Sequence, residues 1–104
     1  MRVLTRKTLR LFWESEPQHL GAKGPLEAWL TEAEAATWKD PADVKDKYRN
    51  ASILKAGRVV FNIKGNDYRL IVQINYEMGV ILVKWVGTHK DYDEIEDIQA
   101  IGGS

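Results

Sequence analysis

The chain contains no cysteine among its 104 residues. This absence excludes a thiolate nucleophile, a cysteine-ligated metal centre and a disulfide scaffold, and it fits a cytoplasmic protein. Histidine is also scarce, because only His19 and His89 are present and they lie far apart in the sequence. We therefore expect neither a metal site nor any other cofactor.

Long apolar runs are absent as well. No segment approaches the roughly 20 apolar residues that a membrane-spanning helix needs, and the N-terminus lacks the apolar stretch of a signal peptide. No internal repeat or low-complexity segment interrupts the chain, and its length is that of one domain with a modest core. We expect a single domain, residues 1–104, that is soluble and cytoplasmic and has no membrane partner.

The net charge of zero conceals an uneven distribution of charge along the chain. Residues 1–12 carry basic side chains and no acidic one, whereas the final twelve residues carry acidic side chains and no basic one. Basic residues also outnumber acidic ones over residues 53–92. A chain divided in this way can present a basic face to phosphate while remaining neutral overall. Because charge runs are also typical of ordinary solvated surface, the pattern permits a polyanionic partner without requiring one.

Helix start and stop signals fill the first half of the chain. Thr5 can cap a helix, because its hydroxyl can accept from the exposed amides of the first turn. Asp40 followed by Pro41 is a second such signal, since proline suits the first helical position. From these signals and the apolar spacing we expect a short strand at residues 1–4 and helical segments over residues 5–14, 25–37 and 41–47.

The second half has the two-residue periodicity of strands, with expected strands near residues 58–63, 68–75 and 80–86. The dipeptide Gly65-Asn66 suits a two-residue hairpin turn, because glycine tolerates the positive φ that such turns require. That turn pairs Asn62 with Arg69 and places the apolar side chains of both strands on one face of the sheet.

A second two-residue turn is expected at residues 78–79. In that register Val72 faces Trp85, and Lys84 lies beside Gln73 on the other face. Helices followed by an antiparallel meander indicate an α+β fold, with N-terminal helices packed on a C-terminal antiparallel sheet. Three tryptophans are then most simply core residues, namely Trp13, Trp29 and Trp85. The opposite face of the sheet is expected to be polar and to carry Arg58, Asn62, Arg69, Gln73 and Lys84.

Polar residues follow the last strand in the segment Gly87–Asp93. In the expected register this segment leaves the sheet beside Arg69, so that His89, Tyr92 and Lys64 can lie close to its guanidinium. This inventory suits cleavage of RNA by its own 2′-hydroxyl, which needs a base, an acid and cations for the developing negative charge. Histidine is the usual acid or base near neutral pH, arginine matches phosphate oxygens bidentately, and tyrosine can stack on a base.

Each of these residues also has an ordinary structural interpretation. A lone histidine at a strand end is more often a capping or surface residue than a catalyst, and Arg69 could pair with a nearby carboxylate. Tyr92 could anchor the C-terminal segment, while Lys64 and Lys90 could be turn residues. From the residues alone the sequence predicts a candidate polyanion site and no more.

Two motifs in this region resemble those of a known family. Residues 61–69 follow the pattern Phe-Asn-x-x-Gly-Asn-x-x-Arg, and residues 88–93 follow the pattern Thr-His-x-x-Tyr-Asp. Both occur in order at the expected separation, and together they resemble the HigB toxins of type II toxin–antitoxin systems. The resemblance implies a RelE-like α+β fold with a short C-terminal helix, and an endoribonuclease that cuts mRNA on the translating ribosome. It also implies a HigA-type helix-turn-helix antitoxin as partner, with operator DNA bound only through the toxin–antitoxin complex.

Carried over by position, the family's site residues fall on the two motifs. Arg69 fits phosphate and transition-state binding, His89 fits the general acid or base, and Tyr92 fits positioning of the cleaved nucleotide. Which residue moves the proton stays open, and no metal or cofactor is implied. Contacts to RNA are expected from the polar residues of the hairpin, the sheet face and the tail, namely Lys64, Lys90, Arg58, Asn62, Asn66 and Lys84.

Two other functions would use the same features. An RNA- or ribosome-binding module without catalysis would bind RNA in a salt-dependent manner and create no new 5′ ends. A protein-interaction domain would use the outer faces of the helices and would tolerate substitutions at Arg58, Arg69 and Lys84. The complete tail motif favours the endoribonuclease.

Overall fold

The computed structural model describes residues 1–98 and has the α+β fold expected from the sequence. Short helices fill the first half of the chain, and three long strands followed by one helix fill the second. In chain order the elements are β1 (Arg2–Leu4), α1 (Lys7–Ser15), the 3-10 helix η1 (Pro17–Ala22), α2 (Lys23–Ala35), α3 (Pro41–Lys47), β2 (Ser52–Ile53), the 3-10 helix η2 (Lys55–Gly57), β3 (Arg58–Ile63), β4 (Tyr68–Asn75), β5 (Val80–Thr88) and α4 (His89–Asp93).

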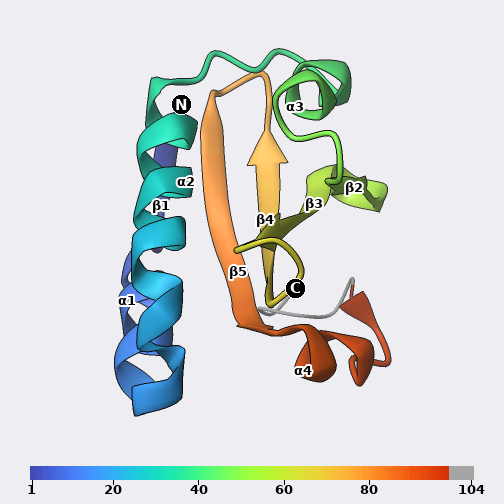
Figure 1. Cartoon of the computed structure of the whole chain (residues 1–104). Coiled ribbons are helices and arrows are strands. Elements are labelled where there is room, and N and C mark those ends of the chain that lie inside the picture. Colours follow the sequence, from blue (N-terminus) through green and yellow to red (C-terminus); the bar gives the residue numbers. More distant parts are fainter. Residues whose placement is uncertain (99–104) are drawn as a thin grey trace.

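The strands form one mixed sheet in the order β1-β5-β4-β3-β2. Strands β2, β3, β4 and β5 pair with one another in antiparallel fashion. Strand β1 is parallel to β5, with Val3 opposite Ile81. The N-terminal strand thus adds to the edge of the C-terminal meander. The sequence predicted this strand but not the strand with which it pairs. Helices α1 and α2 lie side by side along one face of the sheet, and α4 follows the end of β5 (Figure 1).

Helix α1 begins without the side-chain cap expected at Thr5. This residue has a φ of 60°, and its hydroxyl accepts from the Val83 amide at 2.9 Å and lies 2.9 Å from the Val83 carbonyl. Once β1 ends at Leu4, the outer edge of β5 needs hydrogen-bond partners, and Thr5 supplies them. The expected Thr5 cap is therefore wrong, and α1 starts at Lys7 with no side-chain cap.

The other helix signals agree with the structure. Helix α2 starts at Lys23, slightly before the expected residue, and Pro25 lies in its first turn. Asp40 caps α3, because its carboxylate accepts from the Asp43 amide at 3.0 Å and Pro41 occupies the first helical position. Cap and proline together fix the start of this short helix.

The core lies between the helices and one face of the sheet. Trp29 of α2 is 2% exposed and packs on Phe61 of β3, with ring centroids 5.4 Å apart. Trp38 and Tyr48, which flank α3, contact the same phenylalanine ring. The core position expected for Trp29 is therefore confirmed, whereas Trp13 is only partly buried and packs against the core from outside it.

The first hairpin has the predicted register. Asn62 lies opposite Arg69, as expected. The β3–β4 ladder continues without irregularity from there to the pair of Arg58 and Gln73. The chain reverses in the turn, where Gly65 has a φ of 64°. This positive φ is the reason that glycine suits the position.

The second hairpin is aligned differently from the prediction. Val72 lies opposite Val83, Ile71 lies opposite Trp85, and Lys84 is an extra residue in β5 between the two pairs. The ladder therefore contains a β-bulge. An added residue of this kind bends the strand and changes the face on which the following side chains project.

The bulge and the longer loop of the second hairpin each overturn one prediction. Val83 belongs to the core, and strict alternation would bury Trp85 on the same side. The extra residue places Trp85 on the opposite face instead, so the expected core position of Trp85 is wrong. Lys84 does not lie beside Gln73, which pairs with Leu82. That placement is also wrong, because the loop between the strands comprises residues 76–79 and not the expected 78–79, which pairs each nearby β4 residue with a β5 residue two positions earlier.

Candidate active site

The first hairpin and the tail meet at one end of the sheet. Arg69 of β4 lies opposite Gly87 of β5, and Tyr68 lies opposite Thr88 in the next pair. Thr88 ends β5, and α4 follows at once (Figure 1). The segment thus leaves the sheet beside Arg69, as predicted. We call this region the hairpin–α4 corner and define it by the side chains of Asn66, Arg69, Trp85, His89 and Tyr92.

Arg69 is a nearly buried cation, only 8% exposed. Its guanidinium donates to the Asn66 side-chain oxygen at 2.7 Å and to the Asn66 and Tyr68 carbonyls at 3.3 and 3.2 Å. These acceptors are neutral, and within residues 1–98 no carboxylate pairs with the guanidinium. Because a guanidinium has five N–H donors, two of them have no protein partner in this part of the chain. A charge buried in this way is available to an anion.

The Tyr92 ring covers this guanidinium. Arg69 Cζ lies 5.8 Å from the ring centroid, the geometry of a cation–π contact. Tyr92 also contacts the Trp85 ring, with centroids 6.4 Å apart. Trp85 in turn leans over Gly87, where an added Cβ would lie 2.5 Å from two atoms of its ring. Arg69 is therefore covered by Tyr92, and Tyr92 is in contact with Trp85.

Trp85 is the corner residue that sequence reasoning missed. Regular alternation assigns it to the core, and a bulge leaves no reliable trace in the pattern of apolar residues. The one available signal was Gly87, which follows two residues later and offers space for a large neighbour on the same face.

His89 is the first residue of α4, and backbone contacts fix its position. Its amide donates to the Asp67 carbonyl at 3.0 Å, and Thr88 caps the helix by accepting from the Asp91 amide at 3.1 Å. His89 Nδ1 lies 3.4 Å from a carboxylate oxygen of Asp93, one turn later. Since the His89 side chain is 42% exposed, one ring nitrogen faces an acid while the ring stays accessible to solvent.

Three of the predicted RNA-contact residues border the corner. Asn62 lies opposite Arg69 in the ladder. Lys64, in the turn, lies 3.9 Å from an Asp67 carboxylate oxygen, with half of its side chain exposed. Lys90 follows His89 and is exposed on α4. The hairpin tip and α4 thus each carry an exposed lysine, although the Lys64 ammonium lies toward Gly21 of η1 on the helical side of the sheet.

The structure does not bring Arg58 and Lys84 to the corner. Arg58 lies at the other end of β3 and is 3% exposed, so its guanidinium is not at the surface. Lys84 lies in the bulge of β5 and is half-buried. Their expected contacts with RNA remain predictions that their positions do not support.

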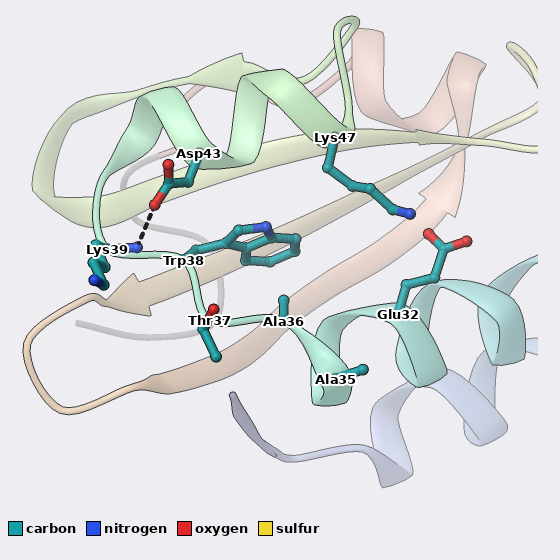
Figure 2. A pocket seen from close by; sticks show the side chains of 8 residues that line it. All are labelled: Glu32, Ala35, Ala36, Thr37, Trp38, Lys39, Asp43 and Lys47. Atoms are coloured by element: carbon teal, nitrogen blue, oxygen red, sulfur yellow. Dashed lines mark hydrogen bonds between the residues drawn. The ribbon is translucent and has the colours of Figure 1, made fainter.

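A hollow of about 650 Å³ lies away from the corner, between the end of α2 and α3 (Figure 2). Trp38 lies along it, and the side chains of Lys47 and Glu32 point toward one another. Glu32 also accepts from the Tyr48 hydroxyl, and burial together with this carboxylate raises the pKa of Tyr48. None of the predicted site residues lines this hollow, so it offers no alternative place for them to meet.

The corner contains groups that phosphodiester chemistry in RNA uses. Arginine donors can bind phosphate oxygens, an imidazole can exchange protons near neutral pH, and aromatic faces can hold a base. Within residues 1–98 no cluster of three or more histidine, aspartate or glutamate side chains is arranged to hold a metal ion. None of the helices in this described part combines the length and apolarity of a membrane span.

Comparison with known proteins agrees with this chemistry. A family model described as HigB_toxin, a RelE-like toxic component of a toxin-antitoxin system, matches residues 22–95, a range that contains the whole corner. The chain is 30% identical over 95 residues to the mRNA interferase toxin HigB of Escherichia coli strain K12, with 89% of this chain and 88% of the relative covered. It is equally similar to the mRNA interferase HigB of Shigella flexneri.

Proposed function

The chain belongs to the HigB family of RelE-like toxins, and from that membership we propose that it is an endoribonuclease that cleaves mRNA on the translating ribosome. Its relatives are named mRNA interferases. Its place of action is then the cytoplasm, where ribosomes translate. The proposal is also specific about chemistry, since it assigns the cleavage to the 2′-hydroxyl of the RNA and requires no metal.

The observation that carries this proposal is the state of Arg69. The side chain is 8% exposed, yet within residues 1–98 it has only neutral hydrogen-bond acceptors. Placing a cation in such a position costs stability unless an anion binds it. A phosphate group in the scissile bond would supply that anion. Two unused N–H donors match the two oxygens that a phosphodiester presents.

The reaction proceeds by an in-line displacement at phosphorus. A base removes the 2′-hydroxyl proton, and the 2′-oxygen forms a bond to the adjacent phosphorus. The bond from phosphorus to the 5′-oxygen breaks, and an acid gives that oxygen a proton. The products are a 2′,3′-cyclic phosphate and a 5′-hydroxyl, and the base is left protonated and the acid deprotonated. Arg69 stabilises the extra negative charge at phosphorus.

His89 is the residue that we assign to proton transfer. If its Nδ1–H donates to Asp93, Nε2 is left as an acceptor, and a neutral imidazole in this tautomer can remove a proton from a hydroxyl. The Asp93 carboxylate then stabilises the imidazolium that forms, as the aspartate does in other His–Asp pairs. Tyr92, held over Arg69, stacks on the nucleotide beside the scissile phosphate. Lys64 and Lys90 contact the RNA backbone on either side.

As a toxin of a toxin-antitoxin system, the protein has an antitoxin partner. We propose that this partner is a HigA-type protein with a helix-turn-helix domain, and that the pair binds operator DNA through that domain. A helix-turn-helix domain places its second helix in the DNA major groove. The toxin itself would then contact the operator only through the complex.

The decisive test uses the purified protein, ribosomes programmed with a defined mRNA, and the same mRNA without ribosomes. We expect new 5′ ends only in the ribosome-bound sample, carrying a hydroxyl that polynucleotide kinase must phosphorylate before ligation. Replacing the nucleotide at the cut by its 2′-deoxy form should abolish that cut. Arg69→Met serves as the inactive control.

Other outcomes separate the alternatives. Binding to ribosomes without any new 5′ end would favour a non-catalytic binding module. Equal cleavage of free and ribosome-bound mRNA would overturn the ribosome dependence alone. Unchanged cleavage at a 2′-deoxy position would overturn the 2′-hydroxyl mechanism.

A further inference from the structure

Strand β5 contains its bulge at the point where it approaches the hairpin–α4 corner. Thr5 holds the backbone of Val83 at the strand edge through contacts of 2.9 Å, and the register shifts over the next residue. In β5 the odd-numbered side chains of Ile81 and Val83 point into the core. Beyond the bulge the even-numbered side chain of Val86 does so instead. The bulge therefore delivers Trp85 to the face of the sheet that carries Arg69.

Gly87 provides the space for the Trp85 ring. An added Cβ at Gly87 would lie 2.5 Å from two atoms of the six-membered ring, a distance that real side chains do not reach. Its φ is not positive, so the backbone does not require glycine there. Glycine is needed because the Trp85 indole occupies the space that a side chain at this position would take.

The Trp85 ring then contacts Tyr92, and Tyr92 covers Arg69. Helix α4, which carries Tyr92, has only five residues. A helix of this length is marginal without tertiary contacts. The position of the Tyr92 ring over the guanidinium therefore depends on what packs against it, and Trp85 is the aromatic neighbour that the structure supplies.

We propose that Trp85 is a positioning residue of the cleavage site, which holds the Tyr92 ring over Arg69 and fixes both for the scissile nucleotide. The inference rests on the proposed RNA cleavage but adds a residue that lies outside the two sequence motifs. Trp85 takes no part in proton transfer. It acts through Tyr92, and it acts only because the bulge and Gly87 let it lie there.

The first test compares Trp85→Ala with Trp85→Phe in single-turnover cleavage on programmed ribosomes. Since small misplacements at a reacting centre cost on the order of 100-fold in rate, we expect Trp85→Ala to lower the maximal rate by about 10- to 100-fold. The concentration of half-saturation should change little. Trp85→Phe keeps a ring against Tyr92 and should recover most of the rate. A full rate with Trp85→Ala would overturn the proposal.

Gly87→Ala tests the same contact from the other side. In the natural background the new methyl group must displace the Trp85 ring, so we expect a loss of rate close to that of Trp85→Ala. In the Trp85→Ala background the ring is gone, and Gly87→Ala should cost little more. Such strong coupling marks residues in direct contact. Additive losses would contradict the proposed role of Gly87.

A measurement on the free protein separates this inference from the proposed function. Protons of the Arg69 side chain lie over the Tyr92 ring and should show upfield ring-current shifts in NMR spectra, which Tyr92→Leu removes. Trp85→Ala should move these shifts toward the Tyr92→Leu values. Trp13→Ala, which removes a partly buried tryptophan on the helical side, should leave them unchanged even if it lowers the melting temperature. Unmoved shifts in Trp85→Ala would overturn the proposal whether or not the protein cleaves RNA.

Discussion

The Arg69 guanidinium lies 5.8 Å from the centre of the Tyr92 ring, although the two residues come from different elements, β4 and α4. The ring face is electron-rich and partly compensates a cation that lacks a carboxylate partner within residues 1–98. Compensation by a ring face and neutral acceptors is weaker than compensation by an acid. The corner is therefore organised for an anion that arrives from outside, at the expense of stability in its absence.

This arrangement predicts that Arg69→Met separates stability from activity. Removing a buried charge without an ionic partner should leave the urea midpoint unchanged or higher. Cleavage should fall by roughly 100-fold or more, since the charge at phosphorus loses its stabilising donors. Parallel urea titrations and cleavage assays of the two proteins make the comparison. A clear drop in the midpoint would mean that Arg69 is a structural residue.

The matched control is Arg69→Lys, which keeps the charge. An ammonium cannot reproduce the planar fork that holds Asn66 and a phosphate together. We expect intermediate activity, well below that of the natural protein. Full activity would show that charge alone, without the guanidinium geometry, is sufficient.

The contact between His89 and Asp93 predicts a large loss of cleavage rate in His89→Ala and a smaller loss in Asp93→Asn. General acid–base catalysis contributes roughly 100- to 10,000-fold, so His89→Ala should lower the cleavage rate within that range. Asp93→Asn keeps the size of the side chain but removes the charge that orients the imidazole, and it should cost about tenfold, because this exposed pair at 3.4 Å is a weak one. The pH–rate profile should lose one limb in His89→Ala only. A profile that keeps both limbs would exclude His89 from proton transfer.

Much of this corner could be predicted from the sequence, because its two halves depend on local signals. The Gly65 turn fixes the register that sets Asn62 opposite Arg69, and the tail motif includes both His89 and the threonine that caps its helix. Periodicity and turn chemistry act over a few residues, and they are readable from one chain.

The remaining errors share a cause, which is contact between distant segments. Thr5 looked like a cap but bonds to Val83, far along the chain. Trp85 looked like core, but a bulge beside that same contact places it on the other face. Neither event can be read from the alternation of apolar residues, because both depend on how β5 pairs with segments far away in the chain. A one-residue slip is enough to exchange the faces of a strand.

The cap of α3 predicts a loss of stability without a loss of function. Asp40 accepts from the Asp43 amide at 3.0 Å, and Asp40→Ala should destabilise the fold by about 1 kcal/mol. The helix lies far from the corner in the structure (Figure 1). Cleavage measured well below the melting temperature should therefore match that of the natural protein. A matching loss of rate would show that α3 is coupled to the active site.

Two tyrosine hydroxyls, one bonded to a carboxylate and one buried without a partner among the described residues, predict a difference between neutral and alkaline pH. The Tyr48 hydroxyl donates to Glu32, whereas that of Tyr76 has no partner within the described residues. Removing a satisfied group costs stability and removing an unsatisfied one does not. At pH 7 we expect Tyr48→Phe to destabilise the fold by about 0.5–1 kcal/mol, and Tyr76→Phe to be neutral or stabilising.

The sign at high pH follows from the raised pKa of Tyr48, caused first by burial and then by the Glu32 carboxylate. Because the folded state keeps the proton above the ordinary value of 10.0, Tyr48 contributes its full stability below that pH. Above it the unfolded chain ionises first, and the contribution declines as the pH rises toward the folded value. The free-energy difference between the natural protein and Tyr48→Phe should therefore be constant from pH 7 to about 9 and shrink beyond 10. Urea titrations at each pH measure it, and a difference that grows above pH 10 would show that the folded state loses the proton first.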